Sequence, residues 1–281
     1  MFKKTGNHSL SCYTNRIAMK RIRFGVVLLL LFSSILPVKA INYINNPSDF
    51  VNPFIGTGGH GHTFPGACAP FGMVQLSPDT RIDGSWDGCG GYHYDDNIIY
   101  GFSHTHLSGT GCSDYGDIAF LPYLKADFEK LGSKAKASLV LNHQKEEAKA
   151  GYYKIGFDHL ACTVELTASA RAGMQQYTFE KEEDIVILLL LDHRDVQLEA
   201  AINEDSKTHI YGMRRSKAWA EDQHIYFDTK FSIPFDKVEY RKNSTGTTLG
   251  VFHFHVTKGQ RILISTGIST VDEKGALQNR E

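Results

Sequence analysis

The chain has 281 residues, of which 42% are hydrophobic and 22% are charged. This composition is that of an ordinary globular protein with one large or two small domains, and it excludes intrinsic disorder. The 30 Lys and Arg residues and 31 Asp and Glu residues give a formal net charge of -1. Such a balance provides no broad basic surface for nucleic acid, so we expect no polyanionic partner.

The first 40 residues are predicted to be a secretory signal peptide. A basic cluster at 20–23 precedes the apolar run 24–36, and Ala40 ends a segment typical of cleavage sites. The run is too short for a comfortable membrane span. We therefore expect an exported chain, periplasmic or extracellular, with no membrane span after cleavage. The sequence leaves open whether translation starts at Met1 or at Met19.

Export permits disulfides, and four cysteines follow the predicted cleavage site: Cys68, Cys89, Cys112 and Cys162. Four cysteines allow three complete pairings, and their spacing matches neither a zinc site nor a CxxC motif. A chain of this size can also fold without disulfides, with the thiols packed as small apolar groups. The sequence leaves both a bridge and free thiols open.

The second half of the chain is predicted to be mainly β-structure. From Gly151 onward, short runs rich in aromatic and β-branched residues alternate with polar or glycine-containing turns. These runs are 152–157, 162–168, 185–191, 224–232, 248–256 and 261–266. Residues 224–232 alternate as in a strand with one solvent-exposed face, whereas 185–191 are apolar throughout and indicate a strand buried on both faces. We predict an antiparallel β-sandwich.

Helix is expected to be scarce. Only two segments, 133–151 and 272–281, have a helix-like composition. The first could equally form a strand followed by a turn.

Residues 51–123 differ from the strand-rich half because they are rich in Gly, His, Asp and Tyr. In 56–62, glycines let the backbone approach a ligand closely, and nearby prolines stiffen the loop. Trp86 and Asp87 combine an indole that can stack on a sugar ring with a carboxylate that can accept hydroxyl hydrogen bonds. We expect these loops to hold a small polar ligand instead of serving only as turns.

The histidines also allow a metal site. His104 and His106 are two residues apart, which places both rings on one face of a strand, and Asp114 and Asp117 follow nearby. The His-x-His pair at 60–62 adds to this pattern, which is typical of cupin-like metal enzymes. A cupin-like metal-dependent enzyme is therefore one alternative function, although a metal needs three or four converging ligands.

Two long motifs carry a family resemblance. "VNPFIGTGGHGHTFPGACAPFGMVQLSPDT" (51–80) and "DGSWDGCGGYHYDDNIIYGFSHTHLSGTGCSDYGDIAFLP" (83–122) closely resemble the N-terminal domain of glycoside hydrolase family 92, whose members are exported, calcium-dependent α-mannosidases. The later segments "SARAGMQQYTF" (169–179) and "STGISTVDEKGALQN" (265–279) are similar to the family's later strands and to the start of its interdomain helix.

The resemblance implies a two-domain enzyme of which this chain carries one part. A β-sandwich domain would span 41–270, the interdomain helix would begin in 271–281, and a catalytic (α/α)6 barrel would follow outside this chain. The function implied is the substrate-binding half of an inverting α-mannosidase, α-1,2-specific and inactive alone, acting on mannose-containing glycans. Calcium would be bound mostly by the barrel. A stand-alone carbohydrate-binding module is the second alternative.

The resemblance assigns no catalytic residue and no metal ligand to this chain. An inverting glycosidase needs two carboxyl groups about 6.5–9.5 Å apart, and the candidates here, Asp87, Asp95, Asp96, Asp114 and Asp117, match binding or loop positions of the motif. In the family, the tryptophan that corresponds to Trp86 helps to form the leaving-group subsite. We predict that the substrate-binding residues are Gly58, His60, His62, Trp86, Asp87, Gly91, Tyr92, His93, His104 and Asp114.

Overall fold

The computed structural model describes residues 46–132 and 136–281. The predicted signal peptide and both candidate start methionines lie outside these residues. The elements described below belong to the body from Pro47 to Glu281. None of the helices in the described ranges is long and apolar enough to cross a membrane.

Strands make up most of the regular secondary structure of this body. Its helical segments are η1 (Pro47–Phe50), α2 (Lys125–Lys130), η2 (His143–Lys145) and α3 (Glu273–Arg280). Its strands are β1 (Ala67–Cys68), β2 (Gln75–Asp79), β3 (Ile98–Ile99), β4 (Gly101–Ser103), β5 (Ala119–Leu124), β6 (Leu139–Val140), β7 (Glu146–Lys149), β8 (Tyr152–Phe157), β9 (Cys162–Ala168), β10 (Ala172–Phe179), β11 (Glu183–Leu190), β12 (Val196–Ser206), β13 (His209–Lys217), β14 (Gln223–Phe231), β15 (Lys237–Asn243), β16 (Gly246–Val256) and β17 (Arg261–Ser269).

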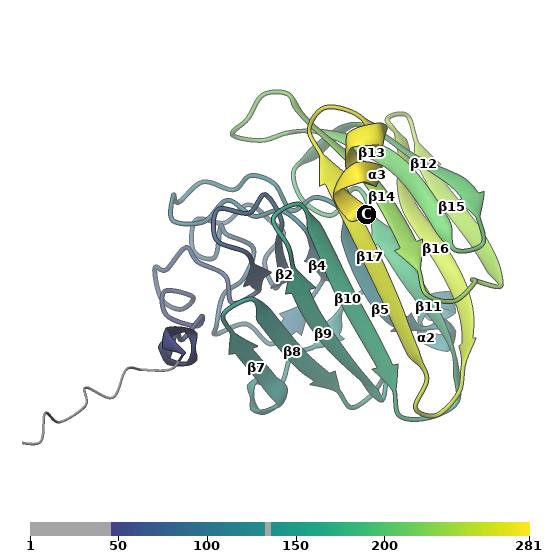
Figure 1. Ribbon diagram of the computed structural model, residues 1–281, viewed down its shortest axis with the longest axis horizontal. Coiled ribbons are helices and arrows are strands. Elements are labelled where there is room, and N and C mark those ends of the chain that lie inside the picture. The colour runs from purple at the N-terminus through teal and green to yellow at the C-terminus, as the bar shows by residue number, and fades with distance from the viewer. Residues whose placement is uncertain (1–45, 133–135) are drawn as a thin grey trace, which may run out of the picture. The chain divides into compact units, whose positions relative to one another are not determined.

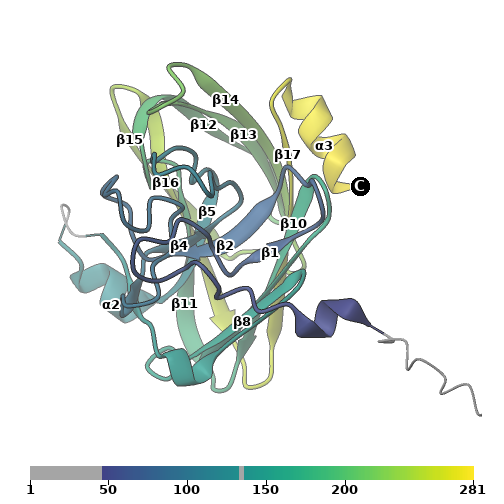
Figure 2. The same cartoon turned by 90° about the vertical axis from the view of Figure 1, so that its left-hand side faces the viewer.

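Within the described residues, fifteen strands form one sheet in the order β1-β2-β4-β5-β11-β16-β12-β13-β14-β17-β10-β9-β8-β7, with β15 paired to β16. Neighbours are antiparallel, except that β12 meets β16 in a parallel pairing at Ala200 and Gly246. The strands β1 and β2 lie close to β8 and β9 at the other end of the order. The sheet therefore curls nearly into a barrel (Figures 1 and 2). The prediction of a mainly β, sandwich-like fold with little helix is confirmed.

The local predictions hold where the sequence pattern is strong. The expected strands 152–157 and 162–168 coincide with β8 and β9. In the described part of 133–151, β6, η2 and β7 replace the helix, in agreement with the alternative of a strand and a turn. The helix-like segment 272–281 forms α3. Its role as an interdomain helix stays a prediction.

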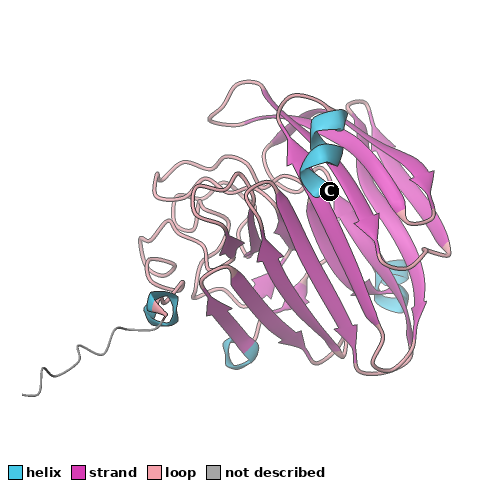
Figure 3. Cartoon of the chain, viewed as in Figure 1, coloured by secondary structure: helices cyan, strands magenta, loops and turns pink. Residues whose placement is uncertain are grey.

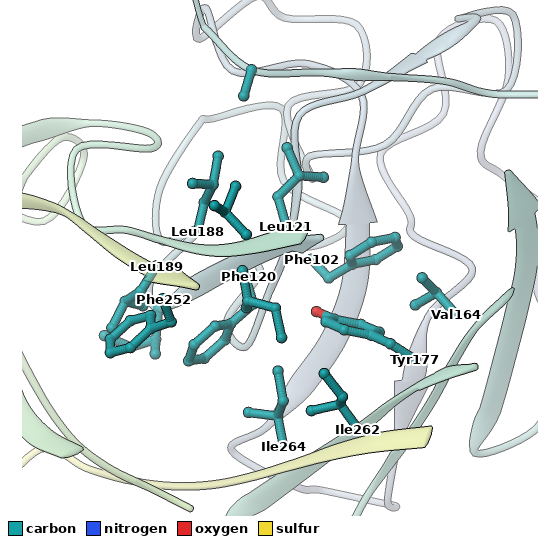
Figure 4. Close-up of a cluster of buried hydrophobic side chains, with 14 of the residues drawn as sticks. Phe102, Phe120, Leu121, Val164, Tyr177, Leu188, Leu189, Phe252, Ile262 and Ile264 are labelled. Atoms are coloured by element: carbon teal, nitrogen blue, oxygen red, sulfur yellow. The ribbon is translucent and has the colours of Figure 1, made fainter. Parts of the chain in front are cut away.

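The core is built around β11. Neighbouring residues of a strand point to opposite faces, and both Leu188 and Leu189 are fully buried. Figure 4 shows them in a cluster with Phe102 of β4 and Phe120 of β5. Burying one such side chain stabilises the fold by about 1.5–3 kcal/mol. This central strand therefore fixes the position of the short strands that carry the loops of 51–123.

The C-terminal helix packs directly on the sheet. The side chain of Asp272 caps α3 by accepting a hydrogen bond from the Gly275 N–H at 2.6 Å. A Cβ atom at Gly267 of β17 would collide with the carbonyl oxygen of Ala276, so only glycine allows this close approach. Arg280 forms an ion pair with Asp228 of β14. The helix covers a face of β14 that the alternating sequence pattern predicted to be exposed to solvent.

A buried ion pair joins the sheet to the loops. Arg214 of β13 pairs with Asp117, which precedes β5, and both side chains are completely buried. The other oxygen of Asp117 accepts hydrogen bonds from Thr105 at 2.7 Å and Gln223 at 2.8 Å. The Arg214 guanidinium also donates to the Leu191 carbonyl at 2.6 Å. Because both charges are compensated, the pair can be buried without an unsatisfied charge.

We expect Arg214→Met to destabilise the protein by about 3–5 kcal/mol, because the variant leaves the Asp117 carboxylate buried without its partner. Arg215→Met is the matched control. Arg215 is the next residue, and its ion pair with Asp222 is partly exposed to solvent, so its loss should cost less than about 1 kcal/mol. Urea unfolding followed by circular dichroism measures both. Equal losses in the two variants would show that the buried pair has no special structural role.

Candidate functional site

Long loops leave the sheet between β1 and β5 and gather on one side of the body (Figure 3). Trp86 lies in this cluster and is 56% exposed, which is high for so large an apolar side chain. His62 contacts it edge to face, with ring centroids 4.4 Å apart, and the His60 ring lies 5.5 Å away. The structure thus brings the 56–62 loop next to the Trp86 turn, the two segments that the sequence analysis expected to hold a ligand.

Asp87 completes the exposed group. The His60 ring donates a hydrogen bond through Nδ1 to Asp87 Oδ1 at 2.8 Å. This hydrogen bond lowers the pKa of the Asp87 carboxyl, so the group is an ionised acceptor at neutral pH. An exposed indole face next to a carboxylate can stack on a sugar ring and accept its hydroxyl hydrogen bonds.

Close backbone packing holds the two loops against each other. The Gly109 N–H donates to the His62 carbonyl at 2.6 Å. A Cβ atom at Gly111 would lie 2.8 Å from Trp86 Nε1, so the 107–113 loop supports the indole from the side. His62 Nε2 is buried and has no hydrogen-bond partner among the described residues. Gly58 lies in the same loop as His62, and a Cβ atom there would make only an ordinary van der Waals contact, 3.6 Å from Tyr94 Cβ.

Beneath this surface, His93 and Tyr92 support the loops. His93 Nδ1 accepts a hydrogen bond from the Asp95 N–H at 3.2 Å, so Nε2 carries the proton and donates to the Gly59 carbonyl at 2.8 Å. The Tyr92 hydroxyl donates to Glu146, at 2.9 Å from Oε1. Burial and the neighbouring Glu146 charge raise the Tyr92 pKa, so the phenol stays protonated. His93 therefore holds the glycine loop from below, whereas Tyr92 ties its own loop to β7.

A buried carboxylate between two histidines lies deeper still. Asp79 is fully buried, and its two oxygens lie 2.8 Å from His106 Nε2 and 2.8 Å from His193 Nε2. Burial favours the neutral carboxyl, but the charges and hydrogen bonds of the two histidines outweigh it and hold the Asp79 pKa well below its usual range. His106 Nδ1 also donates to the Gln75 carbonyl at 2.6 Å. His106 Nδ1 and Nε2 thus each face an oxygen acceptor, and Nε2 also lies 3.1 Å from the Ser103 hydroxyl.

Gly91 explains why this cluster can form next to the site loops. Its φ is +104°, and a Cβ atom there would collide with Asp79 and lie 2.8 Å from His106 and 3.0 Å from Arg194. Only glycine fits this position. Arg194 crosses behind it and donates from one nitrogen to the Cys89 carbonyl and the Ser113 hydroxyl, each at 2.7 Å.

The remaining predicted residues, His104 and Asp114, are buried. His104 Nδ1 donates to the Ile118 carbonyl at 2.6 Å, and burial lowers the His104 pKa to about 4. Asp114 accepts a hydrogen bond from the Ala220 N–H at 3.2 Å, and burial raises its pKa. Of the predicted residues, the structure therefore places Gly58, His60, His62, Trp86 and Asp87 in the loops around the exposed indole, and Gly91, Tyr92, His93, His104 and Asp114 beneath them.

The arrangement of the His and Asp side chains does not favour the alternative of a metal-dependent enzyme. No group of three or more His, Cys, Asp and Glu side chains in the described ranges could hold a metal ion. His106 faces Asp79, whereas His104 faces a backbone carbonyl. Of the candidate acid–base carboxylates, Asp117 pairs with Arg214, Asp96 pairs with Arg81, Asp87 pairs with His60, and Asp95 is exposed.

Sequence analysis did not identify Asp79, His193, Arg194 or Arg214. A signal for two of them was present in 192–195, where Asp, His, Arg and Asp directly follow the apolar run 185–191. Charged residues at the end of a fully buried strand need buried partners. Asp195 in this segment has a pKa raised to about 6, chiefly by burial.

Comparisons with known proteins agree with this fold. The family model described as the glycosyl hydrolase family 92 N-terminal domain matches residues 50–269. The chain is similar to a family GH92 α-mannosidase from Bacteroides thetaiotaomicron, with 28% identity and a TM-score of 0.75 over 83% of this chain and 34% of that one. It is also similar to an inverting mannosidase of that family from the same organism, with 25% identity and a TM-score of 0.70 over 83% and 32% of the two chains.

The chain is also similar to a curated protein that is described as a glycosidase. A secreted glycosidase of Arthroderma benhamiae is 28% identical over 180 residues, which are 60% of this chain and 23% of the relative. The chain thus spans about a quarter to a third of the length of these relatives.

We expect stability to fall as the pH is lowered through the window set by His104. Its pKa is lowered from 6.5 to about 4 in the folded state, so the unfolded chain binds a proton in this window that the folded chain does not. This proton costs up to about 1.4 kcal/mol of stability per pH unit. His104→Asn keeps an N–H donor toward Ile118 but does not titrate. The loss of unfolding free energy between pH 7 and pH 5 should be about 2 kcal/mol smaller in His104→Asn. An unchanged pH dependence would contradict the assignment.

Proposed function

Because this chain belongs to glycosyl hydrolase family 92 and carries the family's N-terminal domain, we propose that it forms the substrate-binding side of an exported α-mannosidase. The observation that supports this most directly is the exposed Trp86 ring, with His60, His62 and Asp87 around it. The mannosidase names of two similar structures and the secreted state of the curated relative point to the same substrate class and to export.

In the proposed reaction, this chain binds and orients the sugar that leaves. The indole face of Trp86 stacks on the apolar face of the leaving-group sugar. The ionised Asp87, held by His60, accepts a hydroxyl hydrogen bond, and the backbone of the 56–62 loop offers further polar contacts. The bond broken would be an α-mannosidic linkage, α-1,2 in our proposal, on a mannose-containing glycan, and hydrolysis would invert the anomeric centre.

The acid, the base and the calcium ion belong to the rest of the proposed enzyme. Inversion needs a carboxylic acid to protonate the leaving oxygen and a carboxylate to activate water across the sugar. The carboxylates near Trp86 are engaged in structural pairs, and no metal-ligand cluster exists among the residues that the structure describes. We therefore propose that calcium and the catalytic pair come mostly from a C-terminal (α/α)6 barrel domain.

The first test measures catalysis by this chain by itself. We expect the purified protein to release no product above background from an aryl α-mannoside or from α-1,2-mannobiose, with calcium present, because the proposed acid and base lie elsewhere. Product release is followed by absorbance and by chromatography. Robust turnover would overturn the proposed division of labour and would direct attention to the carboxylates between Asp87 and Asp117.

The second test asks whether Trp86 lies in the leaving-group subsite. The chain is joined to the C-terminal part of the Bacteroides thetaiotaomicron α-mannosidase to which it is 28% identical. The variant Trp86→Ala is then compared with Trp219→Ala. Trp219 is also strongly exposed, so it controls for the loss of an indole. Loss of stacking worth about 1–3 kcal/mol should lower kcat/KM for the mannose disaccharide by about ten- to a hundredfold.

An aryl mannoside lacks a leaving-group sugar, so Trp86→Ala should affect its turnover less. Equal losses on both substrates would contradict the subsite assignment. Unchanged kinetics with a lower melting temperature would show that Trp86 is only structural. Tight mannoside binding by the unfused chain, dependent on Trp86, would favour a stand-alone carbohydrate-binding module.

A further inference from the structure

Two cysteines lie in loops that contact each other beside Trp86. Cys89 closes the turn that begins at Trp86, because its N–H donates to the Trp86 carbonyl at 3.3 Å. Cys112 lies in the neighbouring loop, between Gly111 and Ser113. Both thiols are free in the structure. Cys89 is buried and Cys112 is exposed.

The residues on both sides of Cys112 contact the turn that contains Cys89. On one side, a Cβ atom at Gly111 would lie 2.8 Å from Trp86 Nε1. On the other side, one guanidinium nitrogen of Arg194 donates to the Ser113 hydroxyl and to the Cys89 carbonyl, each at 2.7 Å. These two oxygens are therefore no further apart than twice that distance. Cys112 is held between two contacts with the turn that ends at Cys89.

The Cys112 thiol also acts on the Cys89 thiol. Burial raises the pKa of the Cys89 thiol, and the neighbouring Cys112 raises it further, against the effect of Arg194. A disulfide requires Cα atoms less than about 7 Å apart. The contacts of Gly111 and Ser113 with the Trp86 turn hold the two cysteines in adjoining loops. Both segments lie outside the sheet, so closing the bridge requires no change in the strands.

The other two cysteines are too far apart to form a bridge. Cys68 lies near the Ala168 end of β9, because a Cβ atom at Gly151 would be 4.0 Å from the Cys68 carbonyl and the Gly151 carbonyl accepts a hydrogen bond from Thr167. Cys162 is the first residue of the same strand. Six steps along a strand span about 20 Å. Cys162 is moreover buried, with its sulfur against the Thr163 carbonyl.

We propose that Cys89 and Cys112 form a disulfide after export, and that this bridge pins the Trp86 turn to the 107–113 loop. The two thiols lose two protons and two electrons as the S–S bond forms. A disulfide-exchange partner such as glutathione disulfide accepts both and leaves as two thiols. Export of the chain, and any gain in sugar binding from more rigid loops, rest on the proposed function. The contacts between the two loops do not depend on it.

The experiment maps the bridge in the full chain. The protein is incubated in a glutathione redox buffer, alkylated and digested without reduction. We expect a peptide that links Cys89 to Cys112, with a mass about 2 Da below that of the two reduced peptides together, and its loss on adding dithiothreitol. Cys112→Ser should abolish the link, whereas Cys68→Ser should retain it. Alkylation of both Cys89 and Cys112 in the oxidising buffer, or a link to Cys68 or Cys162, would overturn the proposal.

A second readout tests the pinning of the loops. The bridge should raise the melting temperature by about 5 °C over that of the reduced protein. Cys112→Ser should show no difference between the two buffers, and it is expected to fold because Cys112 is exposed. A bridge without a thermal shift would overturn the pinning. Neither readout involves a sugar, so a failure of the proposed mannoside site leaves this result intact, and the converse also holds.

Discussion

The loops around Trp86 depend on one buried carboxylate. Asp79 has no contact with solvent, and leaving it without a partner would cost several kcal/mol. Its partners, His106 and His193, come from segments that follow β4 and β11. Phe64 of the glycine-rich loop stacks on His106, with ring centroids 5.1 Å apart. The Asp79 charge therefore fixes its own segment, the two segments that carry His106 and His193, and the glycine-rich loop above them. Moving any of these segments away would expose the carboxylate to solvent or leave it buried without a partner.

This cluster is part of a polar layer between the apolar core and the exposed loops. Asp117 pairs with Arg214, and Glu146 accepts hydrogen bonds from Tyr92 and Tyr153. Asp117 and Tyr92 lie in loops, and their partners Arg214 and Glu146 lie in strands, so these two contacts join loops to the sheet. The strands β1 to β4 are short, so regular backbone pairing alone holds these loops weakly. Buried ion pairs add little net stability compared with apolar packing, but they allow few alternative arrangements of their partners. We infer that the polar layer mainly determines loop position, and the sheet mainly determines stability.

The same division explains which features could be predicted from the sequence. The strands β8 and β9 follow from local alternation and flanking turns, and β11 follows from its continuous apolar run. Trp86 is exposed, and its predicted role in the leaving-group subsite stays a prediction. His104 and Tyr92 share a glycine-rich context with His60, yet they are buried. Tyr92, for example, is buried where its hydroxyl meets Glu146, which is 54 residues away. No local pattern encodes such a contact.

The exposure of Trp86 also limits what this surface can do by itself. A ring that is 56% exposed offers one face to a sugar, and stacking of that kind contributes about 1–3 kcal/mol. A dissociation constant of 1 mM corresponds to about 4.1 kcal/mol, so one stacked ring with a few hydroxyl contacts gives weak binding at best. Association also costs translational and rotational freedom. A second protein surface in contact with the ligand must therefore supply most of the affinity. The Trp86 surface is therefore better suited to orienting one sugar of a larger ligand than to capturing a free monosaccharide.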